Sequence, residues 1–415
     1  MVTGISPQKT QEEGYTEAEF AKILANEIFT PETVTIGFNN IRFDDEFIRH
    51  LFWRNFYDAY EWSWRENRSR WDLLDVVRMT RALRPEGIKW PVDENGKATN
   101  RLELLTKEND IDHFKAHDAL SDVEALIAVT RLIRQKQPQL FKYLFSMRDK
   151  NKVQSLVNLE NKQPFVYTSG RYDSNFEKTT VAFPLTSGKN SSVVVYDLRY
   201  DPSEFFEKSP KELADILFAK WEDRQKDGFT PLPVKELKYN QVPAVAPLGV
   251  LEKEAGWKKI SLDKETIAKN KNILLSRPDF AEKIRSIYEN RPEFKKSVDP
   301  EAQLYDSFLS DKDKYQMQNI RQADAEKIAD LQPEFIDERL PKLLLHYKAR
   351  NFPNSLSESE AVEWETWRSA RINSQLPDFI KSLQAVSTRE LSEGEGFIIE
   401  ELKLWVESIM PESEE

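Results

Sequence analysis

The chain has 415 residues, of which 39% are hydrophobic and 32% charged, a balance that suits two or three folded domains and excludes a low-complexity chain. It contains no cysteine, which excludes disulfides, thiolate zinc sites and cysteine nucleophiles, and its four histidines are too few for a histidine-rich metal site. No run of about 18 apolar residues and no apolar leader is found, so we expect a soluble, cytoplasmic protein without a membrane partner.

The net charge of −11 argues against a nucleic-acid partner, but the charge is unevenly distributed. Residues 392–415 hold eight Glu and one Lys, whereas residues 40–102 are near neutral and rich in arginine. Local patches bind phosphates, and the average charge does not. The acidic balance therefore does not exclude DNA.

The first third of the chain alternates between helical and strand-like segments. Apolar spacing predicts a buried strand over residues 33–38 and helices over the following ranges: 16–29, 44–56, 72–83, 101–108 and 118–136, the last capped by Asp118. Strands between helices are typical of an α/β domain. One clear strand is too few for a sheet covered by so many helices, so we expect the opening strands of this domain to be absent.

From about residue 153 the apolar period changes to two. Strands are predicted over residues 165–168, 179–183 and 192–197, with helices around 210–226 and 263–288, the latter capped by Asp263. This pattern indicates a small β-barrel decorated by helices. After Pro292 the pattern is helical, and a bundle is expected with apolar faces at these positions: Leu304/Phe308, Phe335/Leu343/Leu344/Tyr347 and Leu376/Phe379/Leu383.

Carboxylates and a histidine stand where strands end or helices begin. Asp44 follows the strand over 33–38, and His117 precedes Asp122 by five residues. Open α/β sheets place their sites beyond the carboxyl ends of strands, and carboxylate oxygens are magnesium ligands. Asp44 and Asp122 could hold metal while His117 deprotonates water, although such a site needs about four carboxylates. The alternatives are a favourable helix-start charge at Asp44 and an incidental histidine beside a capped helix.

The segment from His50 to Trp71 contains eight aromatic residues and four arginines. Rings interleaved with cations suit stacking on single-stranded nucleic acid. The alternative is core packing, which we expect for Phe52, Phe56 and Trp71. Arg101 opens a helix and could hold a phosphate bidentately, although an isolated surface arginine is usually only solvated.

Several motifs together resemble the exodeoxyribonuclease I family, part of the DEDD exonuclease superfamily (His-x4-Asp subtype). They are Gly37-Phe-Asn-Asn-Ile-Arg-Phe-Asp-Asp-Glu46, Trp53-Arg-Asn-Phe-Tyr-Asp58, Ser69-Arg-Trp-Asp-Leu-Leu-Asp75, Arg84-Pro-Glu-Gly-Ile88, Ala116-His-Asp-Ala119, Ala302-Gln-Leu-Tyr305 and Tyr347-Lys-Ala-Arg-Asn-Phe-Pro353. The resemblance implies an α/β ribonuclease H-like nuclease domain over residues 1–137, an SH3-like β-barrel domain over 138–292 and a C-terminal helical domain over 293–415. Together these would enclose a single DNA strand.

The same resemblance assigns residues to roles. Asp44 is similar to the acid of the family's second motif, and His117 and Asp122 are similar to the histidine and last acid of the third. Arg101 matches an arginine that contacts the substrate. The positions expected to face the DNA strand are Arg49, Tyr60, Trp64, Arg78, Tyr143, Lys150, Tyr305 and Phe308. The implied cofactor is Mg²⁺, as two ions, and the implied partners of this expected monomer are single-stranded DNA and the acidic tail of single-stranded-DNA-binding protein.

The implied activity is 3′→5′ degradation of single-stranded DNA to 5′-mononucleotides. The family's first motif, Asp-x-Glu, has no counterpart here, since the residues at Met1 already match the stretch after the first three strands. We therefore expect catalysis by this chain to be strongly impaired, because two metal ligands are lost. Two alternatives remain open: a non-catalytic module that binds single-stranded DNA or a partner, and a helical scaffold unrelated to DNA.

Overall fold

A computed structural model of the protein describes residues 3–112, 119–253, 255–291 and 296–411. The chain forms two compact units. Unit 1 comprises residues 1–33, 45–68 and 295–415, and unit 2 comprises residues 34–44 and 69–294. No helix in the described ranges combines the length and apolar character needed to cross a lipid bilayer.

Unit 2 begins with a small parallel sheet. Strand β1 (Val34–Gly37) pairs with β2 (Ser69–Asp72), with Gly37 opposite Asp72. The expected strand over 33–38 is confirmed, but its expected burial is wrong: Ile36 is 38% exposed, since β2 is the one strand that pairs with β1 in the described chain. Strand β2 was not predicted, because Ser-Arg-Trp-Asp lacks an alternating apolar pattern.

Five helices follow in unit 2. They are α4 (Leu73–Leu83), α5 (Leu102–Glu108), α6 (Ala119–Lys136), α7 (Pro138–Ser146) and α8 (Lys150–Leu156). The helices predicted over 72–83, 101–108 and 118–136 are confirmed, while Asp118 lies outside the described residues. The buried ring of Trp71 packs edge-on at 5.1 Å from both Phe141 and Phe145, so the expected core role of Trp71 is confirmed.

The second sheet of unit 2 is antiparallel, in the order β6-β5-β4-β3-β7. Its strands are β3 (Phe165–Thr168), β4 (Thr179–Ser187), β5 (Ser192–Asp197), β6 (Val234–Lys238) and β7 (Ala244–Pro247). Alternate residues of β3 enter different cores: Val166 joins one cluster, and Phe165 and Tyr167 join another. Both faces of the sheet are therefore buried, which explains why β3 and β5 read as continuous apolar runs.

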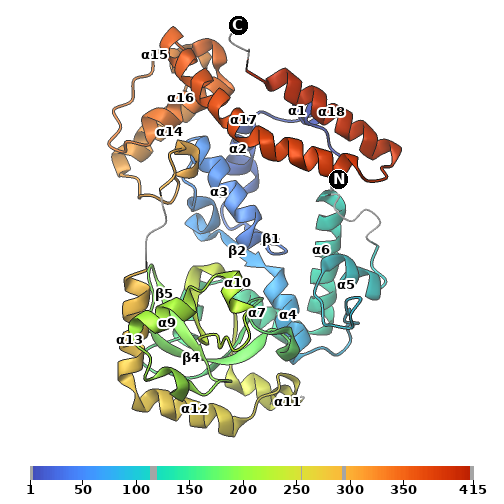
Figure 1. Ribbon diagram of the computed structural model, residues 1–415, viewed down its shortest axis with the longest axis vertical. Helices are drawn as coiled ribbons and strands as arrows, with labels where there is room; N and C mark the ends of the chain where they lie inside the picture. The colour runs from blue at the N-terminus through green and yellow to red at the C-terminus, as the bar shows by residue number, and fades with distance from the viewer. Residues whose placement is uncertain (1–2, 113–118, 254, 292–295, 412–415) are drawn as a thin grey trace. The chain divides into compact units, whose positions relative to one another are not determined.

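The remaining helices of unit 2 pack around this sheet. They are α9 (Pro210–Leu217), α10 (Trp221–Arg224), α11 (Gly256–Lys259), α12 (Lys264–Ser276) and α13 (Pro278–Glu289). The ribbon shows α12 and α13 as neighbouring segments beside the sheet (Figure 1). Asp263 caps α12 by accepting a hydrogen bond from the Thr266 amide at 2.7 Å, as predicted.

Unit 1 is helical. Its helices are α1 (Pro7–Glu13), α2 (Glu17–Ile23), α3 (Asp44–Arg54, whose first residue belongs to unit 2), α14 (Asp311–Gln322), α15 (Ala325–Asp330), α16 (Leu340–Asn351), α17 (Glu358–Ser387) and α18 (Glu393–Ile409). A π-helical turn over Leu24–Ile28 continues α2, so the helix expected over 16–29 is confirmed in both parts. Phe52 and Phe56 are buried, as expected.

One of the apolar faces expected in unit 1 is wrong. Leu304 is buried but Phe308 is 92% exposed, because residues 303–310 form no regular helix and the two side chains share no face. The face of Leu376, Phe379 and Leu383 is confirmed on α17. The three side chains are half-buried, although no residue of this helix is fully buried.

Candidate functional site

The carboxyl ends of β1 and β2 are tied together by one carboxylate. Asp72 accepts hydrogen bonds from the amide of Asn39 at 2.8 Å and from the amide of Leu74 at 3.0 Å, both on the same oxygen. Burial raises the pKa of Asp72 to about 6, against the lowering effect of these amides. Asp72 therefore fixes the turn that leads from β1 to Asp44. The sequence indicated only a helix start at this residue.

The same turn has no room for a side chain at Gly37. A Cβ built there would lie 2.4 Å from the Asn40 Cβ, so the backbone of Gly37 packs directly on that side chain. Asn39 adopts φ 69°, a left-handed conformation that asparagine tolerates better than most residues. These constraints place Asp44 as the exposed first residue of α3, seven residues beyond the end of β1.

The other predicted catalytic residues are placed in part. Asp122 is half-buried in the first turn of α6, and Arg101 precedes the first residue of α5, exposed and ion-paired with Glu103. His117 lies outside the described residues. Within those residues, no group of three or more potential metal-ligand atoms includes Asp44 or Asp122. The structure therefore leaves their joint role as metal ligands a prediction.

One group of potential ligands lies in unit 1: Asp299, Glu301 and His346, with ligand atoms within 4.8 Å of one another. Glu301 accepts from His346 Nδ1 at 3.0 Å and is also ion-paired with Arg350, while Asp299 is ion-paired with Arg371. Burial opposes ionisation of Glu301, but His346 and Arg350 outweigh it and hold its pKa at about 2. The carboxylates are already neutralised, so we interpret this group as a structural ion-pair network.

A mixed aromatic and cationic cluster in unit 1 brings together three residues expected to face DNA. The guanidinium of Arg49 lies 5.7 Å from the centroid of the Tyr60 ring, and the rings of Tyr60 and Tyr305 are 6.5 Å apart. Glu46 links the set, since it is ion-paired with Arg49 and accepts a hydrogen bond from the Tyr305 hydroxyl. The sequence indicated each residue separately; their proximity across 250 positions required the fold.

Two further predicted residues of unit 1 present open rings. The side chain of Trp64 is 63% exposed and that of Phe308 is 92% exposed. An exposed aromatic face offers apolar surface that another ring can cover. Base stacking would provide such a cover without reading sequence.

In unit 2 the three residues predicted to face the DNA strand differ in how exposed their side chains are. Lys150 is exposed at the start of α8. Arg78 donates to Asp75 at 2.6 Å, and its guanidinium lies against the backbone of Gly170, 2.8 Å from where a Cβ would stand. Tyr143 packs on the hydrophobic core, and burial raises its pKa to about 12. Arg78 and Tyr143 are thus less open than Lys150.

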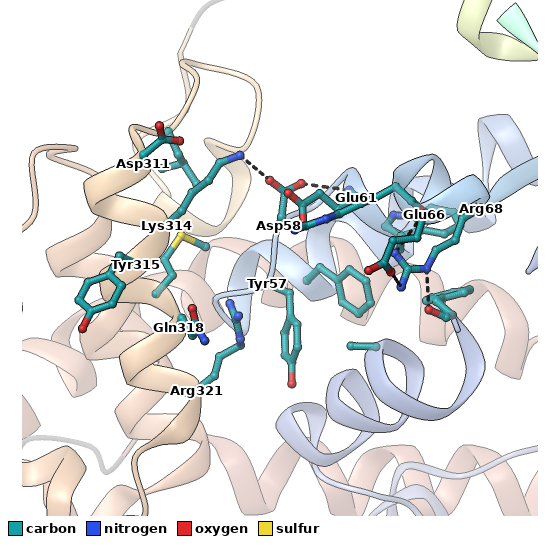
Figure 2. Close-up of a pocket in the computed structure, with 17 residues that line it drawn as sticks. Tyr57, Asp58, Glu61, Glu66, Arg68, Asp311, Lys314, Tyr315, Gln318 and Arg321 are labelled. Carbon is teal, nitrogen blue, oxygen red and sulfur yellow. Dashed lines mark hydrogen bonds and ion pairs between the residues drawn. The ribbon is translucent and has the colours of Figure 1, made fainter. Parts of the chain in front are cut away.

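Unit 1 also contains a cavity of about 600 Å³ between the 57–68 segment and α14 (Figure 2). Lys314 points across it to Asp58 at 3.0 Å, while Arg68 pairs with Glu66 at 2.6 Å (Figure 2). Arg65 likewise pairs with Glu61, and Arg321 lies 4.5 Å over the Tyr57 ring. Because these cations are already paired or stacked, the cavity is poorly suited to an anion.

Three family models match successive segments of the chain. Residues 1–130 match the family described as "Exonuclease", residues 148–290 the "Exonuclease I SH3-like domain", and residues 298–409 the "Exonuclease I C-terminal domain". The chain belongs to the exonuclease I family. Its nuclease part has the ribonuclease H-like fold of that family, followed by an SH3-like domain and a helical C-terminal domain.

Exonuclease I relatives match over most of their length. The exodeoxyribonuclease I of Haemophilus influenzae is 38% identical over 386 residues, which cover 92% of this chain and 81% of that protein. The structure of E. coli exonuclease I with a dA16 oligonucleotide matches with a TM-score of 0.93 at 36% identity, over 99% of this chain and 88% of the other. A structure of SSB/exonuclease I with an inhibitor matches with a TM-score of 0.89 at 34% identity, over 99% and 87% of the two chains.

Proposed function

We propose that this chain is a metal-dependent exonuclease that degrades single-stranded DNA from its 3′ end and releases 5′-mononucleotides. The observation that carries the proposal is the match over 99% of the chain to an exonuclease I structure holding a DNA oligonucleotide. The clustering of Arg49, Tyr60 and Tyr305 supports it, because three residues expected to face DNA are close together.

We assign the metal ligands to Asp44 and Asp122. Both are carboxylates at the first turn of a helix, and their hard oxygen donors suit a divalent cation, which we take to be Mg²⁺. Such an ion would polarise the scissile phosphate and stabilise the departing 3′-oxygen. His117 would accept a proton from the attacking water, and Arg101, exposed at the start of α5, would hold a phosphate oxygen pair.

Strand binding is assigned to the exposed rings and cations. Trp64 and Phe308 would each stack on a base, with Tyr60 and Tyr305 beside them. Arg49, Arg78 and Lys150 would neutralise phosphates along the strand, while Tyr143 would contribute a packed ring. By analogy with the SSB/exonuclease I structure, the acidic tail of single-stranded-DNA-binding protein is the proposed protein partner.

The test uses a 5′-labelled single-stranded oligonucleotide with Mg²⁺ or with EDTA. We expect slow stepwise shortening from the 3′ end in Mg²⁺, because the two ligands of the family's Asp-x-Glu motif have no counterpart here, and none in EDTA. Asp44→Asn and Asp122→Asn should each reduce the rate at least a hundredfold, whereas the matched exposed carboxylate variant Asp227→Asn should not. Shortening that persists in EDTA, or at full rate in both site variants, would refute the proposal.

A non-catalytic single-strand-binding module remains the second candidate. It is favoured by the observation that Asp44 and Asp122 do not join a three-ligand group within the described residues. Oligonucleotide binding should therefore be measured beside cleavage, by fluorescence anisotropy. Binding that persists in EDTA, with no degradation in Mg²⁺, would identify the second candidate.

A further inference from the structure

Unit 2 contains a cavity of about 910 Å³ that none of the roles assigned above uses. It lies between the 171–180 segment, the ends of β5 and β6, and helices α9 and α10. Ligand pockets for small molecules span roughly 300–1,000 Å³, so the space accommodates a nucleotide. None of the residues assigned to the DNA strand lines it.

The lining of this cavity is strongly cationic. Its six cations are Arg171, Lys178, Arg199, Arg224, Lys235 and Arg291, against three carboxylates, Asp173, Asp197 and Glu236. The carboxylates are occupied by local hydrogen bonds: Asp173 accepts from the Asn175 amide at 2.8 Å, and Glu236 accepts from the Ser192 hydroxyl at 2.5 Å. The cavity therefore presents a surplus of positive charge.

Three of these cations are available to a ligand. In the described chain, no carboxylate oxygen lies within ion-pair distance of Arg171, Lys178 or Lys235. Lys235 donates to the Ser169 hydroxyl, and its ammonium lies 4.9 Å from the Tyr172 ring centroid. In the cavity of unit 1, by contrast, Lys314, Arg65 and Arg68 each have a carboxylate partner.

Two polar groups in the cavity favour an anionic ligand. The Tyr172 hydroxyl is buried without a hydrogen-bond partner among the described residues, and such groups are rare in native proteins. Burial, with the charges of Arg171, Arg42 and Arg78, lowers the pKa of Lys235 to about 7, while Asp75 opposes this shift. An anion with oxygen acceptors would satisfy both groups.

The cavity also offers aromatic surface. Tyr200 and Phe218 line it and are 44% and 39% exposed, respectively. We propose that this cavity binds a nucleoside monophosphate unit, with its phosphate against Arg171, Lys178 and Lys235 and its base against Tyr200 and Phe218. The unit would be a free mononucleotide or a nucleotide within a DNA strand. The inference extends the proposed function, because both sources are product or substrate of that reaction.

The experiment measures binding of dAMP, deoxyadenosine and inorganic phosphate to the full chain in EDTA, by isothermal titration calorimetry. We expect dAMP to bind most tightly. Arg171→Gln should weaken dAMP binding about tenfold through loss of a charge-assisted contact, and Tyr172→Phe about fivefold through loss of the hydroxyl. Asp197→Asn should strengthen it, because a negative charge leaves the lining. Arg131→Gln, at an exposed position on α6, is the matched control.

Parallel titrations with an oligonucleotide distinguish the two sources. Sensitivity of dAMP binding to Arg171→Gln and Tyr172→Phe supports a free-nucleotide site. Sensitivity of oligonucleotide binding alone supports a strand-bound nucleotide. If neither ligand responds to the two variants more than to Arg131→Gln, while thermal melting shows all of them folded, the proposal is overturned. If the unsubstituted chain binds dAMP at this cavity but does not cleave the oligonucleotide, the proposed exonuclease function is refuted and the cavity assignment stands.

Discussion

Two aspartates four positions apart illustrate how strongly the local surroundings shift the pKa of a carboxyl group. Asp197 is buried, and burial raises its pKa to about 6 despite hydrogen bonds from the Thr180 hydroxyl and the Arg199 amide. Asp201 is exposed, and bonds from the amide and hydroxyl of Ser203 and from Lys269 lower its pKa to about 2. The two carboxyls therefore contribute to stability with opposite signs.

Asp197→Asn should stabilise the protein most at pH 8, about half as much at pH 5, and leave it unchanged at pH 3. The native carboxyl binds its proton below about pH 6 and the unfolded one below about pH 4, so the stability of the wild type falls as pH rises through this window. Asparagine removes that cost, of roughly 1–3 kcal/mol, while still accepting both hydrogen bonds. Melting temperatures from pH 3 to 8 provide the measurement.

Asp201→Asn is the control for that experiment. Its lowered pKa gives stability that is present above about pH 4 and is lost as pH falls toward 2, so this variant should be less stable than the wild type at pH 8. An equal response of the two variants across the pH range would contradict the assigned environments.

An exposed ring assigned to base stacking should be dispensable for folding. Trp64→Ala is expected to weaken oligonucleotide binding by about 1–3 kcal/mol per lost stack without lowering the melting temperature, because the ring is 63% exposed. Trp221→Ala removes a ring that is 73% exposed on α10 and should leave binding unchanged. Equal loss in both variants would indicate a non-specific effect.

Among the elements, the link from β1 to α3 should tolerate an added side chain poorly. Gly37→Ala should destabilise the fold by about 1–3 kcal/mol and reduce cleavage, because the new methyl group would overlap the Asn40 side chain and shift the turn before Asp44. Gly249→Ala meets no atom within 4 Å and serves as the control in chemical denaturation. Equal denaturation midpoints would show that the turn adapts.

Elements with local signals were the ones that the sequence predicted. Helices α4 and α12 have capping aspartates at residues 72 and 263 and apolar spacing, both of which depend on neighbours in the chain. Strands β2, β6 and β7 were missed, because Ser-Arg-Trp-Asp, Val-Lys-Glu-Leu-Lys and Ala-Val-Ala-Pro are too short or too irregular in apolar pattern to be recognised as strands. Phe308 was assigned to a helix face, since apolar spacing cannot distinguish an exposed ring in a loop from a buried one.

In the candidate site, too, residues with a local sequence signal were predicted and contacts between distant segments were not. Asp44, Asp122 and Arg101 were found from their positions at helix starts, and the structure places each of them there. The bridge from Asp72 to Asn39, the proximity of Tyr60 to Tyr305 and the cationic cavity lined by Arg171 depend on contacts between distant segments. No periodic pattern encodes such contacts, so they required the fold.

For the whole molecule, the salt dependence of DNA binding reports how a protein with a net charge of −11 binds a polyanion. Four assigned cations, Arg49, Arg78, Arg101 and Lys150, predict that the logarithm of the oligonucleotide association constant falls with log[NaCl] with a slope of about −3, at about 0.7 per neutralised phosphate. Arg101→Gln should reduce the magnitude of the slope by about 0.7. Anisotropy titrations at several salt concentrations measure it, and a slope near zero would contradict phosphate binding.

The shared oxygen of Asp72 has a consequence for local opening. Because one carboxylate oxygen accepts from the amides of residues 39 and 74, a displacement of the Asp72 side chain breaks both hydrogen bonds at once. Both amide hydrogens then become exchangeable together. Hydrogen–deuterium exchange should therefore report a common opening free energy for two amides 35 positions apart. Clearly different opening free energies at the two amides would show that the turn and the start of α4 open independently.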